Sequence, residues 1–423
     1  MMDRELLKEV IINQNEQRFY KDLGIERKNL TIIERYLKLP QTIIISGIRR
    51  AGKSTFLAQI ANKYYDRNVY YINFEDERLI DFSINDFNLL HELFIELLGH
   101  KKVFCFDEIQ NIKKWELFVR RMYDDGYKFF ITGSNASLLS KELSTRLTGR
   151  NIVIELYPFS FKEFLTFHNV SITNNSFYIT KEKASIRKYF DMYLAKGGMP
   201  EYLKYNEEDM IKKVYEDILY RDIVSRYDIK DVKALRELAF YLLSNIGSEY
   251  SYNRLKNIVG LKSENTVKNY IHYLENSFLF FTLNKFTYSL KNQYFSQKKI
   301  YCIDNGITES IAFKFSENRG KYLENLVFLE LKKRYEEIYY YKTANKYEVD
   351  FITRDKYRKI FLFQVAQKIS QQETRQREIR SLVEAMNELN LNQAVILTED
   401  NEEQLNINGK KISILSVYKW LLV

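Results

Sequence analysis

The chain has 423 residues, with 65 Lys and Arg against 56 Asp and Glu, and therefore a net charge of +9. This length exceeds one ordinary hydrophobic core, so we expect two or three domains. An apolar content of 45% excludes a disordered or fibrous chain, and the only two cysteines, Cys105 and Cys302, exclude a disulfide framework. Every apolar run is too short for a membrane span and the charged start lacks a signal-peptide core, so we expect a cytoplasmic protein.

The positive charge is concentrated in one short segment. Residues 251–300 hold eight basic and two acidic residues, whereas the stretches on either side are close to neutral. An excess of +6 in so short a segment predicts a single surface that meets an anionic partner.

The first predicted elements are a strand, a glycine-containing loop and a helix. Thr42–Ile45 is an apolar β-branched run, Gly47–Thr55 has the pattern GxxxxGK[ST], and Phe56–Ile60 begins a helical pattern. Two glycines let the backbone turn its N–H groups toward phosphate oxygens, and the helix N-terminus faces the same anion. The predicted nucleotide-binding residues are Gly47, Ile48, Arg49, Arg50, Ala51, Gly52, Lys53, Ser54 and Thr55.

Charged and hydroxyl groups complete this predicted site. Lys53 reaches the β- and γ-phosphates in such loops, and the hydroxyl of Ser54 is a ligand for Mg²⁺. A second apolar run, Val103–Phe106, ends in Asp107 and Glu108. At the carboxyl end of a parallel strand, we expect Asp107 to hold the Mg²⁺ shell and Glu108 to activate the attacking water. The pattern therefore predicts that the chain binds ATP or ADP with Mg²⁺.

Two further segments supply candidate catalytic groups. The predicted strand Lys128–Thr132 is followed by Ser134 and Asn135, either of which could position the attacking water. Asn135 equally suits the N-cap of a short helix. Arg146 and Arg150 precede the next predicted strand. An arginine there either stabilises transition-state charge in a neighbouring subunit, which requires a homo-oligomer, or forms a surface salt bridge.

The chain resembles the prokaryotic ATPases of the AAA superfamily in the stretches GIRRAGKST, FCFDEIQNIKKWE, FFITGSNASLLS and LTGRNIVIELYPFSFKEF. The resemblance continues through Tyr193–Pro200 and Leu219–Ile223. It implies an α/β fold in which a P-loop AAA-type core is fused to a C-terminal domain of unknown function. It also implies that Arg150 is the arginine finger and that Pro200 packs on adenine. The residues alone equally allow a helix-breaking turn at Pro200.

The basic segment 251–300 contains a predicted helix-turn-helix. A short helix near Leu255, a turn at Gly260 and a second helix after Ser263 are followed by strands from Phe278–Leu283, which together predict a winged helix. The residues expected to face a DNA groove are Lys262, Asn265, Lys268 and Asn269, with Lys285, Lys291, Lys298 and Lys299 on or after the wing. Two interpretations stay open: contact with double-stranded DNA, and packing against the nucleotide domain without DNA.

The region after residue 300 has the predicted order helix, three strands, helix, strand. This order, with EVDF on the second strand, resembles the PD-(D/E)XK nuclease fold, whose active members bind divalent metal. Glu324 and Asp350 match the acidic ligands of such sites, but Gln364 and Ala366 stand where an acid and a lysine are expected. Lys368 should lie beyond the active face of the strand. We therefore expect a nuclease-like fold with weakened or absent chemistry.

The predicted domains are a helical lead-in at 1–29, a P-loop AAA-type core at 30–160, a helical lid or linker at 161–230, a winged helix at 231–290 and a PD-(D/E)XK nuclease-like domain at 300–423. The leading hypothesis is Mg²⁺-dependent ATP hydrolysis that drives a conformational change, with DNA as a candidate partner. One alternative is a slow switch that holds ADP and signals through the C-terminal domain. A third, weaker alternative is an active metal-dependent DNA nuclease. The sequence leaves the oligomeric state and the pathway open.

Overall fold

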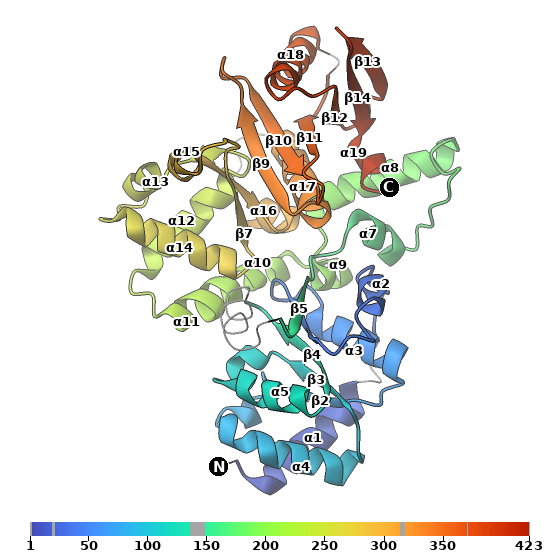
Figure 1. The fold of residues 1–423 in the computed structure, drawn as a ribbon, viewed down its shortest axis with the longest axis vertical. Coiled ribbons are helices and arrows are strands. Elements are labelled where there is room, and N and C mark those ends of the chain that lie inside the picture. Colours follow the sequence, from blue (N-terminus) through green and yellow to red (C-terminus); the bar gives the residue numbers. More distant parts are fainter. Residues whose placement is uncertain (1, 19–21, 136–148, 314–317, 370, 423) are drawn as a thin grey trace. The chain divides into compact units, whose positions relative to one another are not determined.

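The computed structural model describes residues 2–18, 22–135, 149–313, 318–369 and 371–422. The chain divides into two compact units (Figure 1), one of residues 1–158 with 276–278 and one of residues 159–275 with 279–423. Within the described ranges, every helix is too short or too polar to cross a bilayer.

The first unit is a parallel sheet between two layers of helices. Its elements are α1 (Arg4–Arg18), α2 (Leu30–Glu34), β1 (Thr42–Ser46), α3 (Lys53–Tyr65), β2 (Tyr70–Asn73), α4 (Phe87–Leu98), β3 (Val103–Asp107), α5 (Trp115–Asp124), β4 (Lys128–Gly133) and β5 (Asn151–Glu155). The described strands lie in the order β2-β3-β4-β1-β5, and neighbouring strands are parallel. This sheet confirms the predicted α/β class of the nucleotide-binding core.

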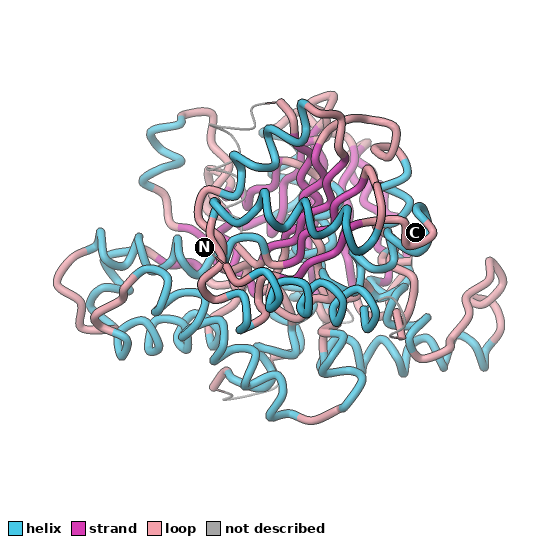
Figure 2. Tube along the Cα trace, turned by 90° about the horizontal axis from the view of Figure 1, so that it is seen from below, coloured by secondary structure: helices cyan, strands magenta, loops and turns pink. Residues whose placement is uncertain are grey.

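Residues of each strand alternate between two hydrophobic cores. Ile44 and Phe104 belong to the core beneath α1, α4 and α5, whereas Ile43 and Cys105 belong to the core beneath α2 and α3. Figure 2, seen from below, shows helices in front of the strands. Because β1 and β3 are buried on both faces, their sequences read as continuous apolar runs rather than alternating ones.

The second unit begins with helices and a small antiparallel sheet. Its first part contains α7 (Phe161–Phe167), α8 (Thr180–Lys196), α9 (Pro200–Tyr205), α10 (Glu208–Asp217), a π-helical segment (Ile218–Val224), α11 (Ser225–Tyr227), α12 (Val232–Ser244), β6 (Glu249–Tyr250), α13 (Tyr252–Ile258), α14 (Glu264–Asn276), β7 (Phe280–Leu283), α15 (Leu290–Phe295), β8 (Lys298–Cys302) and α16 (Asn305–Ile311). Strand β8 lies between β6 and β7 and is antiparallel to both. In Figure 1, α12, α13 and α14 gather beside β7.

The predicted helix pair of the basic segment is present as α13 and α14. Gly260 adopts a φ of +69° between them, and the hydroxyl of Ser263 accepts the N–H of Asn265 at 3.1 Å at the start of α14. The apolar face of α14 is buried as its spacing predicted, through Val267, Tyr270, Ile271 and Leu274. Lys268 and Asn269 of the same helix are exposed.

A mixed sheet forms the rest of the second unit. It consists of α17 (Arg319–Arg334), β9 (Glu337–Lys342), β10 (Glu348–Arg354), β11 (Ile360–Ala366), α18 (Gln372–Glu388), β12 (Gln393–Thr398), β13 (Glu403–Ile407), β14 (Lys410–Ser416) and α19 (Val417–Trp420). The described strands lie in the order β13-β14-β12-β11-β10-β9. The elements from α17 to β12 follow the predicted order, and β13, β14 and α19 extend it.

Candidate functional site

The loop between β1 and α3 requires glycine at two positions. A Cβ atom on Gly47 would lie 2.2 Å from the carbonyl oxygen of Leu156, so any larger residue would clash with the backbone. Gly52 has a φ of +91° and is the N-cap of α3. That left-handed conformation suits glycine and turns the chain into the helix, whose first N–H groups then face the loop.

The Lys53 side chain lies within this loop, with 3% of its surface exposed. Its ammonium group donates to the carbonyl oxygen of Ile48 at 3.2 Å and lies 3.6 Å from Oε1 of Glu108. The lysine of the loop and the acid after β3 therefore meet at one edge of the sheet, because parallel strands all end at that edge.

Asp107 is fully buried and accepts three hydroxyl groups. The hydroxyl of Ser54 donates to Oδ1 at 3.1 Å, that of Tyr71 donates to Oδ2 at 3.0 Å, and that of Thr132 also donates to Oδ1. A hydroxyl and a carboxylate in contact are the hard oxygen ligands that Mg²⁺ prefers. The residues present therefore fit a magnesium ion held by Ser54 and Asp107.

Glu108 has a left-handed backbone, with a φ of +52°. This conformation costs a non-glycine residue roughly 1–2 kcal/mol, and such strained residues are concentrated at functional sites. The N–H of Glu108 donates to Thr132 Oγ1 at 3.0 Å, and the amide of Gln110 donates to its carboxylate at 2.5 Å. Burial alone would raise the pKa of Glu108, but the charge of Lys53 and the Gln110 hydrogen bond hold that pKa below its ordinary value. The carboxylate is therefore ionised at neutral pH, as a general base must be.

Three side chains of this site were not predicted: Tyr71, Gln110 and Thr132. Thr132 is the last residue of the run KFFIT, and the order β3-β4-β1 places its strand between the strands that precede the loop and Glu108. Ser134, which was predicted, accepts a hydrogen bond from Gln110 at 3.4 Å, and the predicted Asn135 is buried nearby along the chain. Thr132 could have been predicted from its place as a polar residue near the end of a strand. Tyr71 offered none, because it lies inside β2.

Arg150 lies at the opposite edge of the sheet from the phosphate loop. Its carbonyl oxygen accepts the N–H of Thr42, the first residue of β1, whereas the loop follows the last residue of that strand. Its guanidinium pairs with Asp124 at 2.6 Å and lies over the ring of Tyr123. Within its own unit, Arg150 therefore cannot reach the loop. The other candidate, Arg146, lies outside the described residues.

Sequence comparisons decide the family. A family model described as an AAA domain matches residues 40–165, and two models described as domains of unknown function match residues 187–318 and 319–420. The uncharacterized protein MJ1544 of Methanocaldococcus jannaschii is 36% identical over all of this chain and 96% of its own. The chain therefore belongs to the same family as MJ1544, and its residues 40–165 form an AAA domain. An uncharacterized protein of Haemophilus influenzae is 31% identical, over 90% of this chain and 94% of its own.

Two solved structures show a more distant similarity to the chain. AMPPCP-bound DnaA from Aquifex aeolicus is 16% identical, with a TM-score of 0.27 over 59% of this chain and 89% of its own. The Aeropyrum pernix ORC1 protein in complex with DNA is 11% identical, with a TM-score of 0.30 over 70% of this chain and 95% of its own.

Outside the AAA domain, the predicted adenine contact Pro200 begins helix α9 at its first turn, where proline is favoured. The two preceding glycines have a packing role. A Cβ on Gly197 would lie 2.0 Å from the carboxylate of Asp304, and one on Gly198 would lie 2.2 Å from the carbonyl oxygen of Phe159. The glycine pair is thus explained by packing within the second unit, and the adenine contact of Pro200 stays a prediction.

The four predicted DNA-facing residues are all exposed: Lys262, which precedes α14, and Asn265, Lys268 and Asn269 on α14. The lysines assigned to the wing behave differently. Lys291 is exposed, Lys285 is half-buried, and Lys298 is half-buried and donates to Asn284 at 2.5 Å. Lys299 is only 2% exposed, so its predicted phosphate contact is wrong. Alternation along β8 turns Lys299 inward, because successive side chains of a strand point to opposite faces.

Lys299 instead lies among three carboxylates of the C-terminal sheet domain. Its ammonium is 3.1 Å from Glu324, 2.6 Å from Glu348 and 3.5 Å from Asp350. Burial opposes its charge, but these carboxylates hold the pKa of Lys299 well above its ordinary value. Burial and the nearby Glu324 raise the pKa of Asp350. We call Glu324, Glu348 and Asp350 the carboxylate cluster.

Gln364, the third predicted member of this site, is bound elsewhere. Its carbonyl oxygen accepts the N–H of Asp350 at 3.2 Å, and its amide donates to Glu378 at 2.7 Å. Lys368 is exposed and follows the end of β11, as expected. The structure therefore brings Glu324 and Asp350 together, adds Glu348 and Lys299, and places Gln364 between the backbone of Asp350 and the carboxylate of Glu378.

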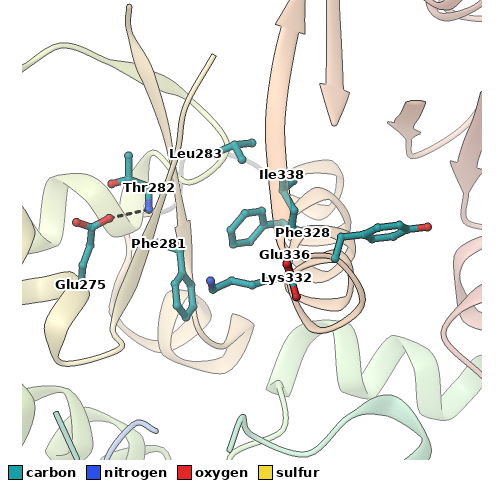
Figure 3. Close-up of a pocket in the computed structure, with 9 residues that line it drawn as sticks. Glu275, Phe281, Thr282, Leu283, Phe328, Lys332, Glu336 and Ile338 are labelled. Carbon is teal, nitrogen blue, oxygen red and sulfur yellow. Dashed lines mark hydrogen bonds between the residues drawn. The ribbon is translucent and has the colours of Figure 1, made fainter. Parts of the chain in front are cut away.

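A pocket of about 250 Å³ lies in the same unit between β7 and α17 (Figure 3). Glu275 accepts the N–H of Thr282 at 3.0 Å, and the ammonium of Lys332 lies 5.0 Å from the centre of the Phe281 ring. The lining residues are Glu275, Phe281, Thr282, Leu283, Phe328, Lys332, Tyr335, Glu336 and Ile338. Two carboxylates against one lysine disfavour a phosphate in this pocket.

Proposed function

We propose that the AAA domain binds ATP with Mg²⁺ and hydrolyses it to drive a conformational change. One observation carries this proposal: Lys53 and Ser54 at the start of α3 meet Asp107 and Glu108 at the end of β3. The distances are 3.6 Å between Lys53 and Glu108 and 3.1 Å between Ser54 and Asp107. A cation, a hydroxyl and two carboxylates at the N-terminus of a helix are the groups that phosphoryl transfer to water requires.

Each group has a separate part in the reaction. Lys53 turns from Glu108 to the β- and γ-phosphate oxygens and stabilises the charge that develops there. Once Lys53 has left, the ionised carboxylate of Glu108 accepts the proton of the attacking water. Ser54 and Asp107 would hold Mg²⁺, which would supply positive charge to neutralise the phosphate oxygens. Thr132 orients the two acids, because it bonds both Asp107 and the N–H of Glu108.

Nucleotide binding and turnover test this proposal together. Lys53→Ala should abolish binding of a fluorescent ATP analogue, whereas the exposed control Lys63→Ala should bind as the wild type does. Steady phosphate release by the wild type supports hydrolysis. A purified protein that retains one equivalent of ADP and releases no phosphate would favour the alternative, a slow switch that holds ADP.

A second candidate function is binding of double-stranded DNA through α14. The exposed lysine and asparagine residues of this helix support it, and so does the wing between β7 and β8, which is free of acidic residues from 276 to 303. Four large side chains of the wing are more than 70% exposed: Tyr288, Leu290, Tyr294 and Phe295. Aromatic groups beside lysine suit contact with bases as well as phosphates.

Fluorescence anisotropy with a labelled duplex at several salt concentrations tests this second function. Lys262→Ala with Lys268→Ala should weaken binding and reduce the slope of log K against log salt by about two. The matched control replaces Lys212 and Lys213, two exposed lysines of α10, and should leave the slope unchanged. If the wild type binds no duplex at low salt, DNA binding by this surface is excluded.

A further inference from the structure

The carboxylate cluster includes Glu324 and Asp350, the two acids that the sequence resemblance to the PD-(D/E)XK fold assigns to a divalent metal. Glu324 lies on α17, and Glu348 and Asp350 lie on one face of β10, two residues apart. Oxygen ligands of this kind bind Mg²⁺ or Mn²⁺ when the space between them is open to the ion. Here that space contains the ammonium group of Lys299.

The ammonium group has one donor for each carboxylate. It donates a charge-assisted hydrogen bond to Glu324 at 3.1 Å and forms ion pairs with Glu348 at 2.6 Å and with Asp350 at 3.5 Å. Lys299 is 2% exposed, so water does not compete for these contacts. Across the residues that the structure describes, no group of three or more acidic, histidine or cysteine side chains is arranged to hold a metal ion.

The neighbours of Lys299 fix β8 to the same site. Tyr301, two residues along β8, donates its hydroxyl to Glu324 at 2.7 Å and stacks on Phe328 with ring centres 4.1 Å apart. Asn325 accepts the N–H of Cys302 and donates to its carbonyl oxygen, both at 2.9 Å. Side chains of α17 thus contact both a side chain and the backbone of β8. Strand β8 is the central strand of the small sheet.

We propose that Lys299 takes the place of the divalent metal in this site, so that the C-terminal domain uses its carboxylates as a metal-independent ionic latch on β8 rather than as a nuclease centre. The latch connects the module that carries α13 and α14 to the C-terminal sheet. A residue from outside the predicted nuclease motif therefore supplies the charge that Mg²⁺ supplies in active relatives of that fold. The proposal is independent of ATP hydrolysis, because it concerns the second unit alone.

Mn²⁺ binding to the full chain without nucleotide tests the proposal, by electron paramagnetic resonance in an Asp107→Asn background that disables the phosphate-loop metal site. We expect no bound Mn²⁺ at millimolar concentration, and no change in the unfolding midpoint on adding Mn²⁺ or EDTA. One Mn²⁺ ion that is lost on Asp350→Asn would overturn the proposal. So would Mn²⁺-dependent DNA cleavage that both Lys299→Met and Asp350→Asn abolish, which would make Lys299 a catalytic lysine.

The Lys299→Met variant tests whether the carboxylate cluster binds a metal ion once the ammonium group is removed. Removing the ammonium group that contacts all three carboxylates should lower the unfolding midpoint by several degrees. Mn²⁺ should restore the midpoint in Lys299→Met and should not restore it when Asp350→Asn is added. Lys298→Met, a change at the adjacent half-buried lysine, is the matched control and should gain no response to Mn²⁺. If Lys299→Met fails to fold, Mn²⁺ binding to the Asp107→Asn protein still tests whether the carboxylate cluster holds a metal ion.

Discussion

The carboxylate of Asp304 accepts the backbone N–H of Gly198 at 2.6 Å, although the two residues are 106 positions apart in the chain. The other oxygen of Asp304 accepts the N–H of Gly306 at 2.8 Å. The approach is so close that a Cβ on Gly306 would lie 2.2 Å from the carbonyl oxygen of Lys196. The turn after α8 and the turn before α16 are therefore one packed junction within the second unit.

Replacing Gly198 with alanine should destabilise the second unit. The new Cβ would lie 2.2 Å from the carbonyl oxygen of Phe159, and neither backbone segment can move away cheaply. We expect a loss of about 1–3 kcal/mol in the free energy of unfolding, measured by urea denaturation. Gly320→Ala is the control: it lies in α17 with no atom within 4 Å of its Cβ, so it should be neutral or stabilising. Equal effects from both variants would contradict this account.

The stability of the protein should depend on the ionisation of Asp304. Burial raises the pKa of Asp304 to about 7, although backbone N–H groups from Gly198 and Gly306 act in the opposite direction. The unfolded value is about 3.9. Between these two values the folded state holds the proton more tightly, so its stability falls as the pH rises from about 4 to about 7.

Asp304→Asn removes this titration. The difference in unfolding free energy between wild type and variant should shift by up to about 1.4 kcal/mol per pH unit within that window and level off above it. Asp209→Asn, at a side chain 95% exposed, is the control and should show no such slope. If the difference in unfolding free energy between wild type and Asp304→Asn is constant from acid to neutral pH, the pKa of Asp304 is not raised.

Replacing Glu108 with glutamine should separate binding from hydrolysis. Glutamine keeps the size of the side chain but cannot accept a proton, so turnover should fall by about 10²–10⁴. Binding of ATP should be retained or tighter, because Lys53 no longer has a carboxylate 3.6 Å away. Phosphate release and nucleotide titration measure the two effects. Glu92→Gln, at a side chain 69% exposed on α4, should change neither. Normal turnover in Glu108→Gln would remove Glu108 from the role of general base.

Arg150→Ala should leave ATP affinity unchanged, because Arg150 is at the far edge of the sheet from the loop of its own chain. If Arg150 is an arginine finger, its effect must arise in an oligomer. Loss of turnover should then appear only at concentrations where the wild type associates, and an Arg150→Ala chain mixed with a Lys53→Ala chain should regain activity. Loss of turnover in a dilute monomer would contradict the geometry, and no loss at any concentration leaves the Asp124 salt bridge as its role.

The sequence alone was sufficient to predict the strand, loop and helix around Lys53, the strand that precedes Glu108, and the order of elements from α17 to β12. These features are local: a buried parallel strand is a continuous apolar run, and a phosphate loop needs glycine, lysine and a hydroxyl at fixed spacing. The buried face of α14 was readable for the same reason, because helical periodicity sets it.

Only the tertiary structure decided where distant segments meet. Lys299 counted in sequence as part of a basic surface, yet the pairing of β8 with β6 and β7 turns it toward carboxylates 25 to 51 residues further along the chain. Arg150 is on the edge away from the phosphate loop because β5 is parallel to β1. The glycine pair before Pro200 is explained by Asp304, which no local pattern connects to it. Composition determined how much positive charge the chain carries. The fold determined which lysines are exposed, such as Lys262 and Lys268, and which are buried against carboxylates, such as Lys299.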